Sequence, residues 1–244
     1  MFNEEERIKP FDLFAFLSFF AWLFLGPSIF AVPLLMIAPL IMGISTEEYL
    51  ATGLLNEHQY IVAVLSHILG IVGFVLLYKK TIKTDCKNFV SKLWLFLIII
   101  FVGFGLLYAS NYLMSWLYNE LGLGGQTSQN QQGIIDALHG STAPFVIIYT
   151  VILAPIFEEI VFRKLFYTVL KKYTKIPVWA IVIIISSVFA FIHVSDLESL
   201  VFFPQYFVLA LIITGAYAIT KENLIVSTGL HFLNNIVAVS EIFL

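Results

Sequence analysis

Charged residues are scarce in this sequence. They make up 12% of its 244 residues, whereas a soluble domain carries about 25%. The net charge of −3 shows no basic excess, so the composition gives no reason to expect a nucleic-acid partner. Hydrophobic residues make up 60% of the chain, and the mean hydropathy is +0.94. These values exclude an ordinary soluble domain and predict an integral, multipass membrane protein, in the cell membrane if the source is bacterial.

The sequence also lacks a disulfide framework and a secretory signal. Cys86 is the only cysteine, which excludes an intramolecular disulfide and a cysteine-ligated metal site. It falls in a lysine-rich stretch outside the apolar runs, so we expect no cysteine nucleophile within the membrane. The first residues, Met-Phe-Asn-Glu-Glu-Glu-Arg, are too acidic for a signal peptide, and the apolar run after them is too long for one. We expect this N-terminal segment to be retained.

Long apolar runs predict an all-α, polytopic transmembrane bundle, because in lipid every backbone polar group must be paired within the protein. We expect one integral membrane domain over residues 1–244, without internal repeats. Gly26-Pro27 interrupts the first run, for which we predict one kinked helix. Residues 45–59 and 79–92 are predicted to be loops, and 134–139 a short interfacial helix. The seven predicted passes cover residues 11–42, 60–78, 93–118, 144–170, 177–194, 206–219 and 224–244.

The basic residues fall on one side of this seven-pass arrangement. All thirteen Lys and Arg residues precede the first pass, occupy residues 79–92, end or follow the fourth pass, or lie between the sixth and seventh. Cytoplasmic loops are enriched in Lys and Arg. We therefore predict a cytoplasmic N-terminus, and we expect the lysines at 79–92 to touch anionic lipid.

Three charged groups lie together in the fourth run, where a charge near a helix centre costs about 2.5–3.5 kcal/mol on insertion scales. Glu159 and Arg163 are four residues apart and are predicted to form an ion pair on one helix face. Glu158 is turned by about 100° from Glu159. It is therefore expected to point away from the pair, into the bundle interior or a water-filled cavity.

Two histidines and one amide lie in other predicted passes. His193 ends the fifth, and His231 and Asn235 share one face of the seventh. Together with Glu158, these residue types can hydrolyse a carbonyl compound. A carboxylate and an imidazole can activate water, and a second histidine and an amide can donate to the oxyanion that forms. We expect the three helices to bring these four side chains around one pocket.

The residue types leave alternatives open. Two histidines and a glutamate are also a known catalytic zinc set, so zinc stays open as a cofactor, with Glu158, His193 and His231 as candidate ligands. Buried Glu and His also carry protons in ion-coupled transporters, although the absence of repeats weighs against a transporter. The third alternative is a non-catalytic scaffold or immunity protein, against which the complete polar set argues.

Three motifs carry a resemblance to a known family. Glu158-Glu159-x-x-x-Arg163, Phe189-x-x-x-His193 and His231-x-x-x-Asn235 resemble, in this order, the motifs of the CAAX-protease and bacteriocin-processing family of intramembrane proteases. That family includes the type II CAAX prenyl endopeptidases. The resemblance covers about residues 144–236, and we place the predicted catalytic core at 144–240.

The resemblance implies a role for each matching residue. Glu158 would activate water with the help of His193, and His231 and Asn235 would form the oxyanion site. The reaction implied is cleavage of a peptide or membrane-associated protein, by the glutamate itself or with a metal, in settings that include bacteriocin processing and self-immunity. Structurally known relatives have eight membrane helices, so residues 11–42 would be a hairpin or the chain would have one helix fewer. The implied supporting residues are Glu159, Arg163 and Phe189.

Two further polar residues in the apolar runs are expected to be structural. His67, in the second pass, is predicted to be a satisfied core histidine. Asn111, in the third pass, is predicted to bond a neighbouring helix. Neither is assigned a catalytic role.

Overall fold

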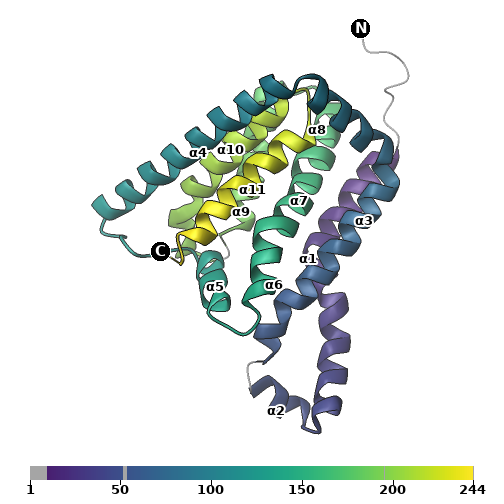
Figure 1. Cartoon of the computed structure of the whole chain (residues 1–244), viewed down its shortest axis with the longest axis vertical. Helices are drawn as coiled ribbons and strands as arrows, with labels where there is room; N and C mark the ends of the chain where they lie inside the picture. The colour runs from purple at the N-terminus through teal and green to yellow at the C-terminus, as the bar shows by residue number, and fades with distance from the viewer. Residues whose placement is uncertain (1–9, 52–53, 195, 244) are drawn as a thin grey trace.

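The computed structural model describes residues 10–51, 54–194 and 196–243, and this part of the chain is helical without strands (Figure 1). The predicted all-α class is therefore confirmed for the described residues. Among these described residues, five stretches are long and apolar enough to cross a membrane, and α9 (Val178–Ile192) and α11 (Leu224–Ser240) are shorter apolar helices. The five long stretches are Phe11–Met42, His58–Ser91, Leu93–Glu120, Ala143–Tyr173 and Ser199–Ile219.

The first predicted pass is one helix, α1 (Pro10–Met42), which contains three prolines after its first turn. A hairpin at this position is therefore excluded. α1 packs along α3 (Leu54–Ser91), and the two helices lie side by side in Figure 1. On the other side of the molecule, α4 (Leu93–Glu120) packs against α10 (Phe203–Ile219) and α11.

The prediction of a lysine-rich loop at 79–92 is wrong, because α3 continues through this segment. Tyr78 alone departs from helical angles, with φ −113° and ψ 23°, and marks a kink where the apolar part ends. Beyond it, Ile82, Asp85 and Phe89 are buried or half-buried at helical spacing, while the lysines are exposed. Since lysine is a good helix former, the charged segment forms an amphipathic extension of the helix.

Three short helices lie in the polar connections. One of them confirms the helix predicted at 134–139, and the Ser128 hydroxyl caps its N-terminus by accepting from the Gln131 N–H. Another corrects the loop predicted at 45–59, of which residues 52–53 lie outside the described part. The three are α2 (Thr46–Ala51), α5 (Gln129–Leu138) and the 3₁₀ helix η4 (Ser199–Phe202).

The fourth pass, Ala143–Tyr173, alternates between α- and π-helical turns, which the apolar pattern did not predict. π turns are rare and are frequent at functional sites. This pass contacts α1 and α3 on one side and α9 and α11 on the other, so it lies in the middle of the bundle (Figure 1). Its parts are α6 (Ala143–Ile147), η2 (Ile148–Leu153), α7 (Ala154–Glu158), η3 (Glu159–Phe166) and α8 (Tyr167–Tyr173).

Polar contacts join the helices at the lysine-bearing end of the bundle. Lys172 of α8 lies 2.9 Å from Asp12 of α1. The Asp85 carboxylate accepts from the Leu224 N–H at 3.3 Å and lies 3.6 Å from Lys164. α11 therefore begins at a carboxylate of α3, which suits the positive end of its dipole. The opposite end of the bundle carries α2, α5 and the end of α11 (Figure 1).

Candidate active site

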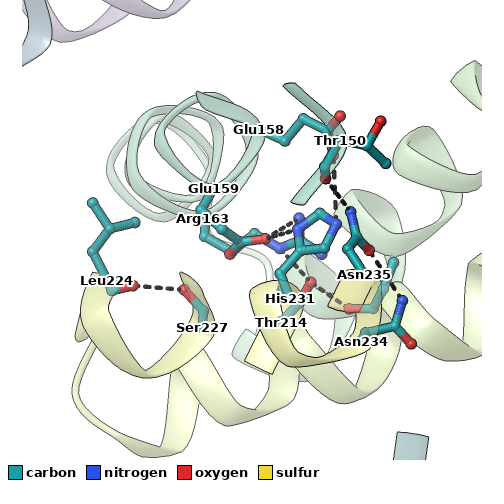
Figure 2. Close-up of polar contacts among 11 residues, drawn as sticks. Thr150, Glu158, Glu159, Arg163, Thr214, Leu224, Ser227, His231, Asn234 and Asn235 are labelled. Atoms are coloured by element: carbon teal, nitrogen blue, oxygen red, sulfur yellow. Dashed lines mark hydrogen bonds and ion pairs between the residues drawn. The ribbon is translucent and has the colours of Figure 1, made fainter. Parts of the chain in front are cut away.

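A buried ion pair lies at the centre of the candidate site, as the spacing predicted. Arg163 Nη1 lies 2.8 Å from Glu159 Oε1, and both side chains are fully buried (Figure 2). The guanidinium also donates from Nε to Thr214 Oγ1 of α10 at 3.3 Å. It lies over the Phe189 ring, 4.7 Å from the centroid. These partners offset part of the cost of burying two charges.

His231 of α11 bonds the same carboxylate. Its Nδ1 lies 2.9 Å from Glu159 Oε1. An ionised carboxylate only accepts, so the proton of a neutral ring is on Nδ1, and Nε2 carries the lone pair. Nε2 lies 3.7 Å from Glu158 Oε2. Glu159 therefore sets the ring orientation of His231 and directs Nε2 to Glu158.

His193 follows the last turn of α9, and that turn orients its ring. Nδ1 donates to the Phe189 carbonyl oxygen at 2.8 Å, so Nε2 carries the lone pair of the neutral ring. The imidazole stacks on the Phe189 ring with centroids 4.3 Å apart, and the same ring meets His231 at a steep angle, 5.9 Å away. Phe189 therefore packs against both histidines at once.

Asn235 of α11 bonds the backbone of the fourth pass. Its Nδ2 donates to the Thr150 carbonyl oxygen at 2.8 Å (Figure 2). The π turn leaves this oxygen without its usual donor: the Ala154 N–H bonds the Tyr149 carbonyl instead, and Pro155 has no N–H. An unpaired backbone carbonyl within a membrane is costly. The amide of a neighbouring helix therefore replaces the missing backbone donor.

A cavity of about 380 Å³ brings the predicted catalytic residues together. It has room for several water molecules, each of which takes about 30 Å³. From these residues it extends along Tyr206 to the polar connection between α4 and α5. The predicted catalytic residues that line it are Glu158, His193, His231 and Asn235.

Two residues of the site were not singled out from the sequence. Asn234 accepts from Asn111 Nδ2 at 3.2 Å and donates from Nδ2 to Asn235 Oδ1 at 3.2 Å. The expectation that Asn111 bonds a neighbouring helix is thus confirmed. A second amide beside Asn235 in an apolar helix was the available signal for Asn234. Thr150 gave no signal, because it acts through its backbone.

The expectation for His67 is met only in part. Its Nδ1 donates to the Ala63 carbonyl oxygen at 2.9 Å, whereas its buried Nε2 has no hydrogen-bond partner among the described residues. The ring lies edge-on to Tyr149 and Phe157, with centroids 4.9 Å and 5.0 Å away. His67 is therefore a packed core residue with one unsatisfied nitrogen.

The candidate zinc ligands do not form a preorganised metal site. A catalytic zinc takes three protein ligands at about 2.0–2.2 Å. Within residues 10–51, 54–194 and 196–243, no group of three or more His, Cys, Asp or Glu side chains is placed to hold a metal ion. The arrangement instead offers a carboxylate and two imidazole nitrogens on one cavity wall.

Comparison with known proteins agrees with the motifs. Residues 140–237 match the model of the type II CAAX prenyl endopeptidase Rce1-like family, and the matched range contains all three motifs. No match was found among curated proteins or among solved structures. With its long apolar helices, the chain is an integral membrane protein whose residues 140–237 are similar to the Rce1-like family of type II CAAX prenyl endopeptidases.

Proposed function

We propose that this protein is an intramembrane endopeptidase in which Glu158 activates the attacking water. The observation that carries the proposal is the cavity, which the side chains of Glu158, His193 and His231 line from three helices. The Rce1-like match supports a protease at the level of the family.

Glu158 is the better candidate for the base of the two adjacent glutamates. Glu159 is held by Arg163 and His231, whereas Glu158 lines the cavity. The Glu158 carboxylate takes a proton from water, and the water oxygen forms a bond to the carbonyl carbon of the peptide. His193 Nε2 accepts a hydrogen bond from the second O–H of the same water and so holds the molecule for attack.

Asn235 and His231 stabilise the oxyanion in this proposal. The Asn235 amide uses one N–H on Thr150 and has the second for the oxyanion. Because Glu159 holds Nδ1 of His231, the ring donates from Nε2 when it carries both protons. When the tetrahedral intermediate breaks down, the proton held by Glu158 passes to the leaving amine as the C–N bond breaks.

The proposed catalytic type is glutamate-based. The described side chains offer no three-ligand group for a metal, and water activation by a carboxylate and an imidazole needs none. The carboxylate would leave the reaction in its starting, deprotonated state once the amine has taken the proton. No covalent intermediate with the protein forms.

The cavity suits a peptide segment as substrate. Its volume of about 380 Å³ lies near the lower end of the range of about 300–1,000 Å³ for ligand sites, so it accommodates the residues next to the cleaved bond. Amide and hydroxyl groups on its wall can bond a peptide backbone. These groups belong to Gln126, Thr127, Asn130, Gln205 and Tyr206.

A peptidase assay on the purified protein tests the proposal. The wild-type protein should cleave a peptide presented in detergent or vesicles, with prenylated and unmodified forms of one sequence compared side by side. His193→Ala should cleave much more slowly, and a strong chelator should leave the wild-type rate unchanged. Loss of activity on chelation with recovery on added zinc would contradict the glutamate mechanism. Full activity of His193→Ala would contradict the site.

A further inference from the structure

Three side-chain amides form a chain of hydrogen bonds that ends at the proposed oxyanion site. Asn111 of α4 donates to Asn234 Oδ1 at 3.2 Å, and Asn234 donates to Asn235 Oδ1 at 3.2 Å. Asn235 then donates to the Thr150 carbonyl oxygen at 2.8 Å. Each amide accepts through its oxygen and donates through its nitrogen, so the chain has one direction. All three amides line the cavity.

The Thr150 carbonyl fixes this direction. The two ends of an amide have similar shapes, so its orientation must follow from its partners. A carbonyl oxygen only accepts, so Asn235 must turn its NH₂ group to Thr150. Its Oδ1 then faces Asn234 and takes a donor from it. This sets the amide of Asn234, whose own oxygen takes its donor from Asn111.

We infer that Asn111 is a positioning residue for the oxyanion site. Through Asn234 it holds the Asn235 amide with its NH₂ group, and not its oxygen, towards the developing oxyanion. Without Asn111, the oxygen of Asn234 loses its donor, and the Asn234 amide can turn. Asn235 then loses the donor to its Oδ1, and only the Thr150 carbonyl still holds its amide. A head-to-tail chain also polarises the last N–H groups, which strengthens them as donors. This inference rests on the proposed function.

The helices α4 and α11 also meet at a contact that does not involve the hydrogen bond between Asn111 and Asn234. Gly103 of α4, about two turns before Asn111, lies so close to Leu230 of α11 that a Cβ on Gly103 would meet the leucine side chain at 2.9 Å. Small residues of this kind let membrane helices approach closely. Asn111 can therefore be changed while this contact remains, and its hydrogen bond to Asn234 is available to orient the Asn234 amide.

Kinetics of single and double variants test the inference. Asn111→Leu keeps a similar side-chain volume without the hydrogen-bond donor. Asn111→Ser has a side chain too short to reach Asn234 Oδ1. Both should lower kcat about tenfold with KM nearly unchanged, against the roughly 100-fold loss expected for Asn235→Ala as an oxyanion donor. Asn111→Leu combined with Asn235→Ala should be no slower than Asn235→Ala alone, since the first acts through the second. Ser110→Ala, which removes a bond of α4 to its own Leu107 carbonyl, is the matched control.

Each outcome decides the inference. Unchanged kcat in Asn111→Leu, additive losses in the double variant, or an equal loss in Ser110→Ala would overturn the positioning role while the protease proposal stands. If the wild-type protein cleaves no peptide, the proposed function fails by itself. In that case, a combined change of Tm in the Asn111→Leu and Asn234→Leu double variant that differs from the sum of the single changes would show that the hydrogen bonds between these amides are structural only. That result overturns the inference as well.

Discussion

The two histidines and the amide of the candidate site each donate to an acceptor that orients them. His193 is turned by the Phe189 carbonyl, and His231 by the Glu159 carboxylate. Asn235 is turned by a backbone carbonyl that a proline leaves open. Because these acceptors lie on helices, the positions of the rings and of the amide are set before a substrate arrives, which is a requirement for electrostatic stabilisation of an oxyanion.

Removing one half of the buried ion pair should be costly. Arg163→Leu leaves the Glu159 carboxylate buried at 0% exposure without its cation, which should lower the free energy of unfolding by about 3–5 kcal/mol. Glu159→Leu with Arg163→Leu should recover much of that loss but not the peptidase activity, because His231 would still lack the group that orients it. Thermal unfolding and kcat, measured on the same detergent-purified samples, check both statements.

A surface pair supplies the control for that prediction. Lys172 and Asp12 also form an ion pair, but the lysine side chain is 35% exposed. Lys172→Leu should therefore change the free energy of unfolding by no more than about 1 kcal/mol. Equal losses of unfolding free energy in Arg163→Leu and Lys172→Leu would show that the buried pair contributes no more to stability than the surface pair.

Much of the site could be predicted from residue types and spacing. The Glu159–Arg163 pair follows from a separation of four residues, and the expectation that Glu158 faces a polar cavity follows from the cost of a charge in lipid. The bond from Asn235 to Thr150 could not be predicted, because it depends on which carbonyl a π turn leaves open. The link from Asn111 to Asn234 also needed the placement of α4 beside α11, which one sequence does not contain.

At the scale of elements, the fourth pass shows how a local irregularity serves a site. Pro155 and the π turn before it free one carbonyl, and the bond from α11 to that carbonyl ties the helix of the third motif to the pass that contains the first. The apolar pattern predicted the extent of this pass within a few residues, since hydrophobicity sets where a helix can cross lipid. The same pattern does not predict the helical course of residues 79–91, because lysines occur both in loops and on the exposed face of a helix.

Restoring the backbone donor should separate stability from activity. Pro155→Ala supplies an N–H that can bond the Thr150 carbonyl and compete with Asn235. Proline costs up to about 3 kcal/mol in a helix interior relative to alanine, so Tm should stay the same or rise. The kcat should fall about tenfold, as expected for a misplaced oxyanion donor.

Pro144→Ala is the control for this prediction, because Pro144 lies in the first turn of α6, where proline is tolerated. It should leave kcat unchanged. Wild-type kcat in Pro155→Ala would show that the amide of Asn235 does not need the free carbonyl, and would contradict the account of the π turn.

At the scale of the whole molecule, the cavity and the lysines lie at opposite ends of the bundle. The cavity reaches the connection between α4 and α5, whereas the lysine-rich part of α3 lies at the other end, next to the start of α4 (Figure 1). With the lysines on the cytoplasmic side, the cavity would open on the other side of the membrane.

Thiol labelling in sealed vesicles checks this arrangement. Cys86 is exposed at the lysine-bearing end, and Asn130 lines the cavity near its polar end. An impermeant thiol reagent should label Cys86 from one face only. It should label Asn130→Cys, in a Cys86→Ser background, from the other face only. Labelling of both positions from the same face would contradict the separation of the two ends.

The central claim is that the Glu158 carboxylate activates the attacking water, and the kcat of Glu158→Gln tests it most directly. Glutamine keeps the size but cannot take the proton, so kcat should fall by about 10²–10⁴, the usual contribution of a general base, without a change in Tm. Glu241→Gln, which makes the same change in another carboxylate on the cavity wall, should cleave at the wild-type rate. A Glu158→Gln protein that cleaves peptide as fast as the wild type would contradict the account.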